Sequence, residues 1–425
     1  MRPLFLLALL LVPNQSWARD TAIVNAQLLD NTHDAELVTI LIRDGLIEDV
    51  AADSHIPADA DIIDAAGRPV TQALSAAATQ LGLVNLGDAT DTDDRAATVP
   101  SLGAAFEVGR AVDPNALTIQ NARAQGITAA LIFPEGGETP FSGTAAWLEL
   151  DPAADLIMKP SAAIFARVDG QAGGGSRGAA WARIRLALDM ARSGTSADVL
   201  RADPILSPAN IAALQTLFEH RVKLAILADR ESDIKQAIEL SRDYEIGVVV
   251  VGGAEAWRLA KELSRSNVGI VLDPLDELPV SYDKIGARRD NAALLNEAGV
   301  PIALMVSGQG IYLSWNVGNA LRQGAGLAAA HGLPRSAAIE AITVGPKRIW
   351  SRDEVKGLTK GARADLVVWD GDPLEPSSAP VHVIFGGREY SQLTRQMLLR
   401  DRYHPGRVER ASSPATPGAQ QRPKH

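Results

Sequence analysis

The sequence predicts an α/β protein in which a (β/α)8 TIM-like barrel is joined to a small β-sandwich domain formed by both ends of the chain. Short apolar runs alternate with helical stretches over about 270 residues in the middle of the chain, a length that suits such a barrel. Short strands separated by turn residues precede this region, and a matching stretch follows it. Continuous apolar strands between helices indicate a parallel sheet covered on both faces. A doubly wound open sheet is the alternative arrangement.

The beginning of the chain is typical of a secretory signal peptide. Met1-Arg2 is followed by an apolar run from Leu4 to Val12 and by small residues at Ser16 and Ala18. This run is too short to cross a membrane, which takes about 20 apolar residues. We therefore expect residues 1–18 to be removed and the mature protein to be periplasmic or secreted, without a membrane anchor. The chain has no cysteine, so its core must be stable without disulfides.

Both ends of the remaining chain are predicted to contribute strands to the β-sandwich domain. Residues 19–70 contain short apolar segments and a turn at Asp44-Gly45, a pattern that favours antiparallel hairpins. Residues 355–400 contain a similar pattern around Asp370-Gly371. Residues 404–425 are rich in Pro, Ser, Gly, Gln and Arg, and we expect a disordered tail there.

Residues 71–354 are assigned to the barrel. The apolar runs predict strands at Gly82 to Leu86, Ile127 to Phe133, Ala162 to Val168, Leu224 to Ala228, Val248 to Val251, Gly269 to Leu272 and Ile302 to Val306. The helical stretches predict helices at Arg177 to Arg192, Pro208 to Phe218, Glu231 to Arg242, Ala254 to Ser266, Asn291 to Glu297, Trp315 to Ala330 and Pro334 to Ile342.

The composition excludes some classes of protein. Hydrophobic residues make up 46% of the chain, which is enough for a large core. The net charge of −10 argues against nucleic-acid binding, because such proteins gather Lys and Arg on one face.

Two segments at the borders of the barrel resemble those of the metal-dependent amidohydrolases. Ile62 to Val70 is similar to the segment that leads into the first barrel strand of those enzymes, and Gly357 to Trp369 is similar to the one that returns to their sandwich. Other segments resemble exported, imidazolonepropionase-like members of the superfamily: Asn121 to Gly143, Gly173 to Arg177, Ala228 to Ile234, Gly252 to Trp257 and Asp290 to Leu295. The resemblance implies one or two divalent metals at the mouth of the barrel, where its strands have their carboxyl ends. It also implies hydrolysis of carbon–nitrogen bonds, and many relatives form dimers.

The histidines that hold metals in this superfamily are missing from the corresponding positions. Ala78 and Gln80 stand where the resemblance places the two histidines of the first strand, and Leu227 and Gly252 stand at the positions expected on the fifth and sixth strands. The usual aspartate region of the eighth strand reads Ser307-Gly308-Gln309-Gly310. None of the seven histidines lies at the carboxyl end of a predicted barrel strand. We therefore expect a degenerate metal site and no metal cofactor.

Carboxylates near the strand ends leave an alternative open. The catalytic candidates are Asp229, Glu255 and Asp273, and with Asp88 and Asp290 they could hold Mg²⁺ or Ca²⁺. Structural roles suit the same residues, since carboxylates often cap helices, close turns and pair with a neighbouring cation.

Polar residues expected in the pocket complete the candidate site: Gln80, Glu135, Lys159, Arg230, Ser307 and Gln309. Ligand sites in such barrels lie at the mouth whatever residues line it. Lys159 lies near the place of a fourth-strand lysine that some relatives carboxylate as a bridging metal ligand. A solvated lysine at a strand edge is the simpler interpretation.

Two functions follow from these features. The first is a non-catalytic pseudo-hydrolase that binds a small molecule or a partner protein at the mouth of the barrel. The second is an active hydrolase of carbon–nitrogen bonds, in non-peptide or dipeptide amides, with an atypical site built from carboxylates. A partner could be a second copy of the chain or an active relative.

Overall fold

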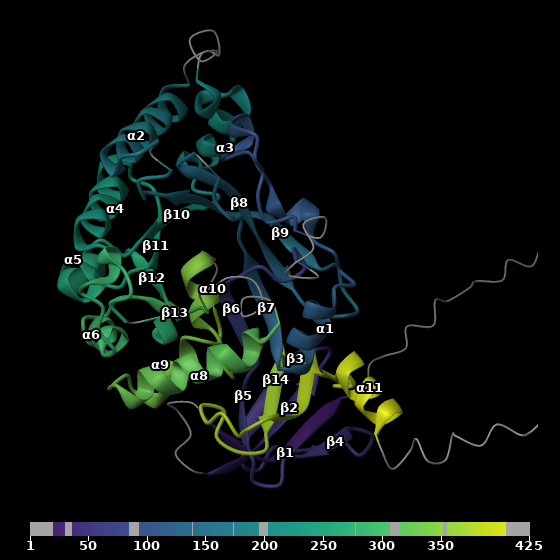
Figure 1. Ribbon diagram of the computed structural model, residues 1–425. Helices are drawn as coiled ribbons and strands as arrows, with labels where there is room; N and C mark the ends of the chain where they lie inside the picture. The colour runs from purple at the N-terminus through teal and green to yellow at the C-terminus, as the bar shows by residue number, and fades with distance from the viewer. Residues whose placement is uncertain are drawn as a thin grey trace, which may run out of the picture.

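The computed structural model of the chain describes residues 20–29, 36–84, 93–137, 139–172, 174–194, 203–276, 278–306, 315–351 and 355–404. A barrel built from the middle of the chain lies above a second sheet built from both ends (Figure 1). The predicted α/β class with a TIM-like barrel is therefore confirmed. The predicted signal peptide and all but the first residue of the predicted tail lie outside the described residues. Among the residues that are described, no helix is long and apolar enough to cross a membrane.

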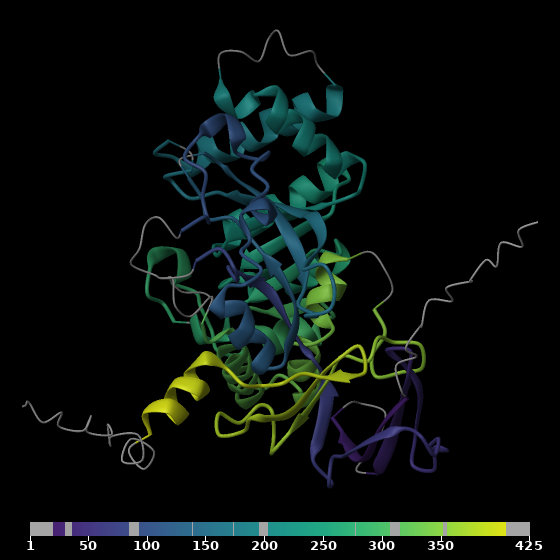
Figure 2. The ribbon, with the colours of Figure 1, turned by 90° about the vertical axis from the view of Figure 1, so that its right-hand side faces the viewer.

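The second sheet joins the two ends of the chain. Its strands are β1 (Thr21–Leu28), β2 (Leu37–Arg43), β3 (Leu46–Ala51), β4 (Asp61–Asp64), β5 (Pro69–Gln72), β14 (Leu366–Trp369), β15 (Pro380–Phe385) and β16 (Arg388–Glu389). Their order is β16-β15-β14-β5-β1-β2-β3, and β4 pairs with β1. The ends meet where β14 pairs antiparallel with β5, Val367 opposite Thr71. Purple and yellow strands accordingly lie side by side in Figures 1 and 2.

The predicted hairpin turn at Asp44-Gly45 is confirmed. Asp44 and Gly45 connect β2 to β3 and have φ angles of 51° and 79°. Two consecutive residues with positive φ match the right-handed twist of the strands that they join, and Asp-Gly tolerates this conformation well.

The barrel contains eight strands that lie in the order of the sequence. They are β6 (Leu74–Thr79), β7 (Ile127–Ile132), β8 (Phe141–Glu149), β9 (Ile157–Arg167), β10 (Lys223–Ala228), β11 (Val248–Gly252), β12 (Gly269–Leu272) and β13 (Ile302–Leu304). Neighbours are parallel except at β8, which is antiparallel to β7 and β9 and was not predicted. The strand predicted from Gly82 to Leu86 does not form over its described residues, 82–84, because the chain turns at Gly82 with φ of 75° after β6 has ended.

The α-helices of the described residues lie around the barrel, within it or beside the second sheet (Figure 1). They are α1 (Leu117–Ala124), α2 (Arg177–Ser193), α3 (Pro208–Phe218), α4 (Glu231–Tyr244), α5 (Ala260–Arg265), α6 (Asn291–Glu297), α8 (Val317–Ala330), α9 (Arg335–Glu340), α10 (Gly345–Trp350) and α11 (Arg395–Tyr403). Short 3-10 helices span Pro100–Leu102, Val108–Ala111, Pro204–Leu206, Ala256–Leu259, Pro274–Asp276 and Tyr282–Lys284. The bounds of α3 and α6 are as predicted, whereas α1, α10 and α11 were not predicted. The helix predicted from Ala254 to Ser266 is divided into a 3-10 turn and α5.

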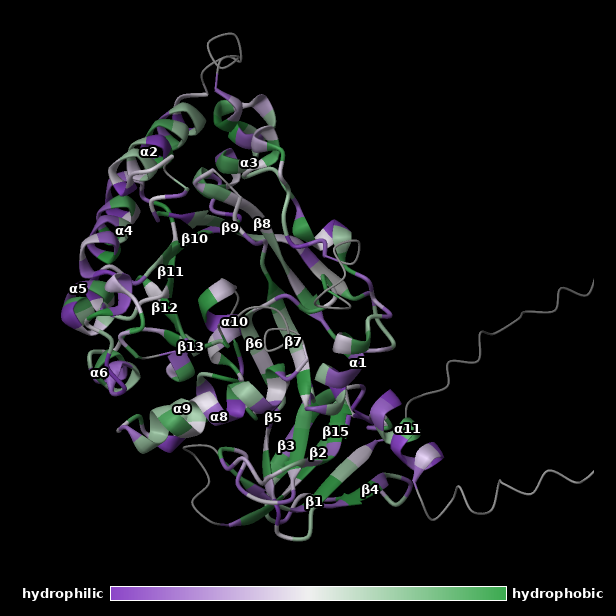
Figure 3. Cartoon of the chain, in the orientation of Figure 1, coloured by the Kyte–Doolittle hydropathy of each residue, from purple (hydrophilic) through white to green (hydrophobic). Residues whose placement is uncertain are grey.

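The helix α4 shows how these helices are held against the strands. Its buried apolar residues include Ile234, Ala237 and Ile238, which recur at helical spacing and face the sheet. Acidic Glu231 and Asp233 lie in its first turn, where they complement the positive end of the helix dipole. Figure 3 shows the resulting division, with apolar strands inside the barrel and polar residues along the outside of α2, α4 and α5.

The barrel is nearly closed by the segment between α9 and α10. The backbone N–H of Leu304, in β13, donates to the carbonyl oxygen of Ala341 at 2.9 Å. The backbone N–H of Ser75, in β6, donates to the carbonyl oxygen of Ile342 at 2.8 Å. The segment Ala341-Ile342 therefore bridges the last strand to the first.

Candidate functional site

Apolar side chains fill the inside of the barrel as far as its mouth. Phe133 follows β7, Phe165 lies near the end of β9, Leu227 and Val251 lie near the ends of β10 and β11, and Met305 follows β13. They pack in one apolar cluster, in which Phe165 is fully buried and Phe133 is 8% exposed. The rings of Phe133 and Phe165 stack with their centroids 5.1 Å apart. Apolar side chains therefore fill the inside of the barrel up to the carboxyl ends of these strands.

The same cluster extends to the amino-terminal end of the barrel through α10. The ring of Trp350 lies 6.0 Å from that of Phe165, between centroids. Its indole N–H donates to the carbonyl oxygen of Ala77 at 2.7 Å. Ile349 belongs to the same apolar cluster. The helix α10 thus packs against the inside of the barrel.

The two positions expected to carry histidines on the first strand have other contacts. Ala78 is 1% exposed and belongs to the apolar cluster. Gln80 is 2% exposed, and its Oε1 accepts a hydrogen bond from Nη1 of Arg95 at 3.2 Å. Arg95 also forms ion pairs with Asp93 at 2.6 Å and with Glu135 at 2.9 Å. The pocket candidates Gln80 and Glu135 are therefore brought together by Arg95, a residue that the sequence did not single out.

Asp229 is a carboxyl at the mouth with a shifted pKa. Burial raises the pKa of Asp229, although the ammonium of Lys284 opposes this effect from 3.9 Å. Its Oδ1 accepts a hydrogen bond from the backbone N–H of Ala254 at 3.2 Å. Lys284 also pairs with Asp276. The carboxyl is thus engaged with its neighbours, and its shifted pKa is of the kind found at functional sites.

The sixth barrel strand, β11, ends at Gly252, where the backbone and Asp229 leave no room for a side chain. Its φ is 103°, a conformation that residues with a side chain rarely adopt. A Cβ atom at this position would lie 2.6 Å from Oδ1 of Asp229. A histidine cannot take this position unless Asp229 and the backbone both move.

The other two catalytic candidates have structural contacts. The carboxylate of Glu255 accepts hydrogen bonds from the backbone N–H of Glu231 at 2.8 Å and from that of Gly286 at 3.0 Å. It therefore caps the amino-terminal end of α4 and ties it to the chain after β12. Asp273, which is 7% exposed, accepts from the backbone N–H of Leu275 at 2.9 Å in the turn that follows β12.

Arg230 takes part in an ion-pair network on the outer rim of the mouth. Its guanidinium lies 2.6 Å from Asp283, which also pairs with Arg177. Arg177 in turn pairs with Asp233 at 2.8 Å. Arg230 therefore forms its ion pair with a residue that is distant in the sequence.

Asp290, the fifth carboxylate candidate, lies apart from this network. It forms a two-point contact with Arg288, at 2.7 and 2.6 Å. Hydrogen bonding from Arg288 lowers the pKa of Asp290.

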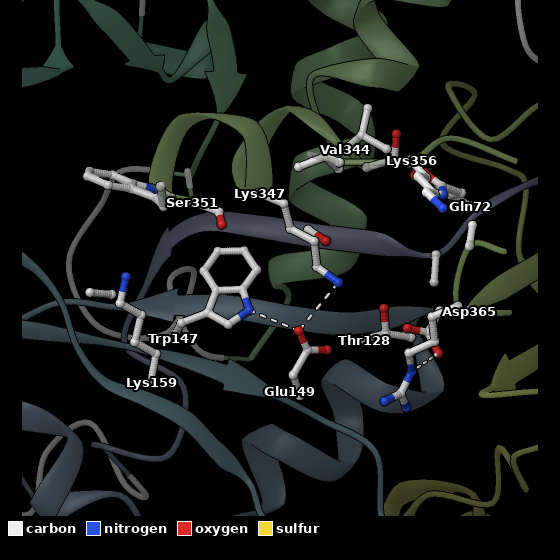
Figure 4. A pocket seen from close by; sticks show the side chains of 18 of the residues that line it. Gln72, Thr128, Trp147, Glu149, Lys159, Val344, Lys347, Ser351, Lys356 and Asp365 are labelled. Atoms are coloured by element: carbon white, nitrogen blue, oxygen red, sulfur yellow. Dashed lines mark hydrogen bonds and ion pairs between the residues drawn. The ribbon is translucent and has the colours of Figure 1, made fainter. Parts of the chain in front are cut away.

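Lys159 lies at the opposite end of the barrel. It is the third residue of β9, near the amino-terminal end of this strand, and its Nζ donates to the carbonyl oxygen of Arg221 at 3.2 Å. It therefore does not lie at the mouth, where the resemblance places the bridging lysine, because the mouth lies at the other end of β9. It instead lines a cavity of about 610 Å³ between the barrel and the second sheet (Figure 4).

A metal of the kind that the resemblance implies does not fit the described residues. They contain no group of three His, Cys, Asp or Glu residues placed to hold a metal ion. An apolar surrounding is also a costly place for an ion, because it supplies no ligands to replace water. Of the candidates, Asp88, Ser307 and Gln309 lie outside the described residues.

Comparisons with known proteins agree with this architecture. The model of the amidohydrolase family matches residues 225–392. An amidohydrolase from Thermotoga maritima MSB8 has a similar structure, with a TM-score of 0.76, 21% sequence identity, and coverage of 87% of this chain and 99% of that chain.

Two further solved structures are similar at lower TM-scores. The N-isopropylammelide isopropylaminohydrolase from Burkholderia multivorans ATCC 17616 has a TM-score of 0.52 and 15% identity, and the alignment covers 88% of this chain and 98% of that chain. The 5-methylcytosine deaminase from Klebsiella pneumoniae has a TM-score of 0.53 and 19% identity, with the same coverage. No curated protein matches the sequence.

Proposed function

This chain has the fold of the amidohydrolase superfamily and its sequence pattern over residues 225–392, and on that premise we propose that it is a non-hydrolytic binding protein. The observation that carries the proposal is the apolar filling of the mouth by Phe133, Phe165, Leu227, Val251 and Met305. Hydrolysis in this superfamily uses a metal-activated water, which needs a polar and ligated site. Among the described residues, Ala78 and Leu227 stand at two of the positions that would carry metal ligands, and both lie in or against the apolar cluster.

The carboxylates around the mouth support the same proposal. Both oxygens of Glu255 accept backbone hydrogen bonds, and Asp273 closes a turn. Carboxylates that satisfy backbone N–H groups stabilise the local structure, which explains their presence without catalysis. Gln80 likewise has a partner in Arg95.

Turnover assays test the proposal directly. The purified protein would be incubated with amides, lactams, hydantoins and small dipeptides, with and without added Zn²⁺, Mn²⁺ or Mg²⁺. We expect no hydrolysis above that of buffer in any combination. Metal-dependent hydrolysis that disappears in a variant of the mouth would contradict the proposal.

A hydrolase with an atypical carboxylate site is the second candidate, and the raised pKa of Asp229 favours it. A carboxyl with a raised pKa, close to a lysine, can act as a general acid or base. This candidate predicts that Asp229→Asn abolishes an activity that Asp290→Asn retains. Equal activity in both variants would exclude a role for Asp229.

The proposal also covers the cellular location and the assembly of the protein, for which the sequence is the basis. We propose that residues 1–18 direct export and that the mature chain acts in the periplasm or outside the cell, alone, as a homodimer or with an active relative. Mass spectrometry of the amino terminus of protein recovered from the periplasm tests export. Sedimentation velocity of the full chain distinguishes a monomer from a dimer.

A further inference from the structure

We propose that the cavity between the amino-terminal end of the barrel and the second sheet binds a small organic anion, a carboxylate or phosphate attached to an apolar group. The cavity has a volume of about 610 Å³, which lies in the range of sites for small molecules. It opens at the end of the barrel opposite to the mouth. The proposal is therefore independent of whether the mouth hydrolyses anything.

The cavity is formed by segments from both parts of the fold. The barrel contributes Ser75 of β6, Thr128 of β7, Trp147 of β8 and Lys159 of β9. The helix α10 contributes Lys347 and Trp350, and the return to the second sheet contributes Lys356, Arg363 and Asp365. Segments so far apart in the sequence meet only in the folded chain, so no local pattern could have indicated the site.

Two hydroxyl groups belong to the lining of this cavity. They are those of Ser75 and Thr128, and each of these residues is 3% exposed. A hydroxyl can donate a hydrogen bond to an anionic oxygen.

The acidic groups of the cavity are already paired. The Oε1 of Glu149 accepts from the indole N–H of Trp147 at 3.0 Å and lies 3.3 Å from Nζ of Lys347 (Figure 4). Asp365 pairs with Arg363 at 3.0 Å and accepts from the backbone N–H of Gly386 at 2.9 Å. These contacts leave little acceptor capacity for a cationic ligand.

The cationic groups are in excess. The lining contains four cationic side chains, those of Lys159, Lys347, Lys356 and Arg363. It contains two carboxylates, those of Glu149 and Asp365. Among the described residues, no carboxylate forms an ion pair with Lys159 or Lys356, which lie at the rim. A chain with a net charge of −10 thus presents two such ammonium groups at one cavity. A ligand anion would be attracted there and would give the two ammonium groups an anionic partner.

The apolar part of the lining indicates what kind of group is attached to the anionic end of the ligand. The rings of Trp147 and Trp350 lie at the cavity, together with Ala162 and Val344. Aromatic rings bind flat apolar groups through stacking and buried area. A ligand that combines an anionic end with an aromatic or aliphatic body matches both halves of the surface.

Titration calorimetry of the full chain tests the proposal with defined probes. Indole-3-acetate, phenylacetate and phenyl phosphate are the anions, and indole-3-acetamide is the neutral counterpart of the first. We expect at least one anion to bind, and the carboxylate and phosphate probes show which headgroup is preferred. The neutral amide should bind about tenfold more weakly than indole-3-acetate, because a hydrogen bond to a charged group is lost.

Substitutions locate the site. Lys159→Gln combined with Lys356→Gln should weaken binding of the anion about tenfold and leave binding of the amide unchanged. Lys235→Gln, at an exposed position of α4, is the matched control and should change neither. Thermal unfolding of each variant checks that the fold is retained. Absence of binding by every anion, or equal binding of the anion to the double variant and to the wild type, would overturn the proposal.

Discussion

Truncation of Phe165 tests whether the mouth of the barrel is a packed core. Phe165 is fully buried and touches two aromatic rings, those of Phe133 and Trp350. Replacing a buried phenylalanine by alanine costs about 3–5 kcal/mol, because apolar contacts are lost and a cavity remains. We therefore expect Phe165→Ala to destabilise the protein by that amount.

The expected change in Tm follows from this free energy and from the unfolding entropy of a protein of this size. Unfolding entropy is about 2.1 cal/mol/K per residue, or about 0.9 kcal/mol/K for 425 residues. The Tm of Phe165→Ala should therefore fall by about 3 to 6 °C. Leu278→Ala is a suitable control, since Leu278 is 46% exposed, and its effect should stay below about 0.5 kcal/mol.

Calorimetry measures both shifts, and a small apolar ligand adds a second readout. Toluene should raise the Tm of Phe165→Ala and leave that of the wild type unchanged, because apolar cavities created by truncation bind such molecules. A Tm for Phe165→Ala within about 1 °C of the wild type would refute the reasoning. Such a result would mean that the mouth is open and hydrated.

Three further predictions concern single positions, and a fourth concerns export. Because burial raises the pKa of Asp229 in the folded protein, its ionisation destabilises the fold as pH rises above the ordinary aspartate value of about 3.9. Asp229→Asn should therefore have a higher Tm than the wild type at pH 7, and the difference should vanish near pH 3. Asp290→Asn should shift Tm in the opposite direction at pH 7, because Arg288 lowers the pKa of Asp290, and the same sign for both variants would be inconsistent with these contacts. Gly252→Ala should lower stability by about 1–3 kcal/mol in urea unfolding, because of its φ and of the contact with Asp229, and an unchanged midpoint would show that the chain relaxes there. Export should yield a chain that begins after Ala18, and mass spectrometry that finds the intact leader on periplasmic protein would disprove cleavage.

Local patterns in the sequence were sufficient for most of the barrel. The apolar run from Val248 to Val251 lies within β11, and the helices α3 and α6 have the bounds that the helical stretches of the sequence predict. The strand β8 escaped notice because Ser142, Gly143 and Thr144 interrupt its apolar character, although it is buried along nearly its whole length. The helix α10 begins Gly345-Pro346, which by itself resembles a turn.

The candidate site could be predicted in part. The sequence placed Ala78 and Leu227 where histidines were expected, and both lie in or against the apolar cluster inside the barrel. It could not show that Phe133 and Phe165 stack there, because this contact joins two strands. The position of Lys159 in the barrel could not be predicted, because the sequence predicted that this strand starts at Ala162. The strand β9 starts five residues earlier, at Ile157, and includes Lys159 near its amino-terminal end.

Metal content tests the central claim most directly. The chain would be produced with Zn²⁺, Mn²⁺ and Fe²⁺ in the medium, purified without chelators, and measured by mass spectrometry of the elements. A mouth filled with apolar side chains predicts far less than one equivalent of any of these metals per chain. One or more equivalents, tightly held and lost together with a hydrolytic activity, would contradict the account.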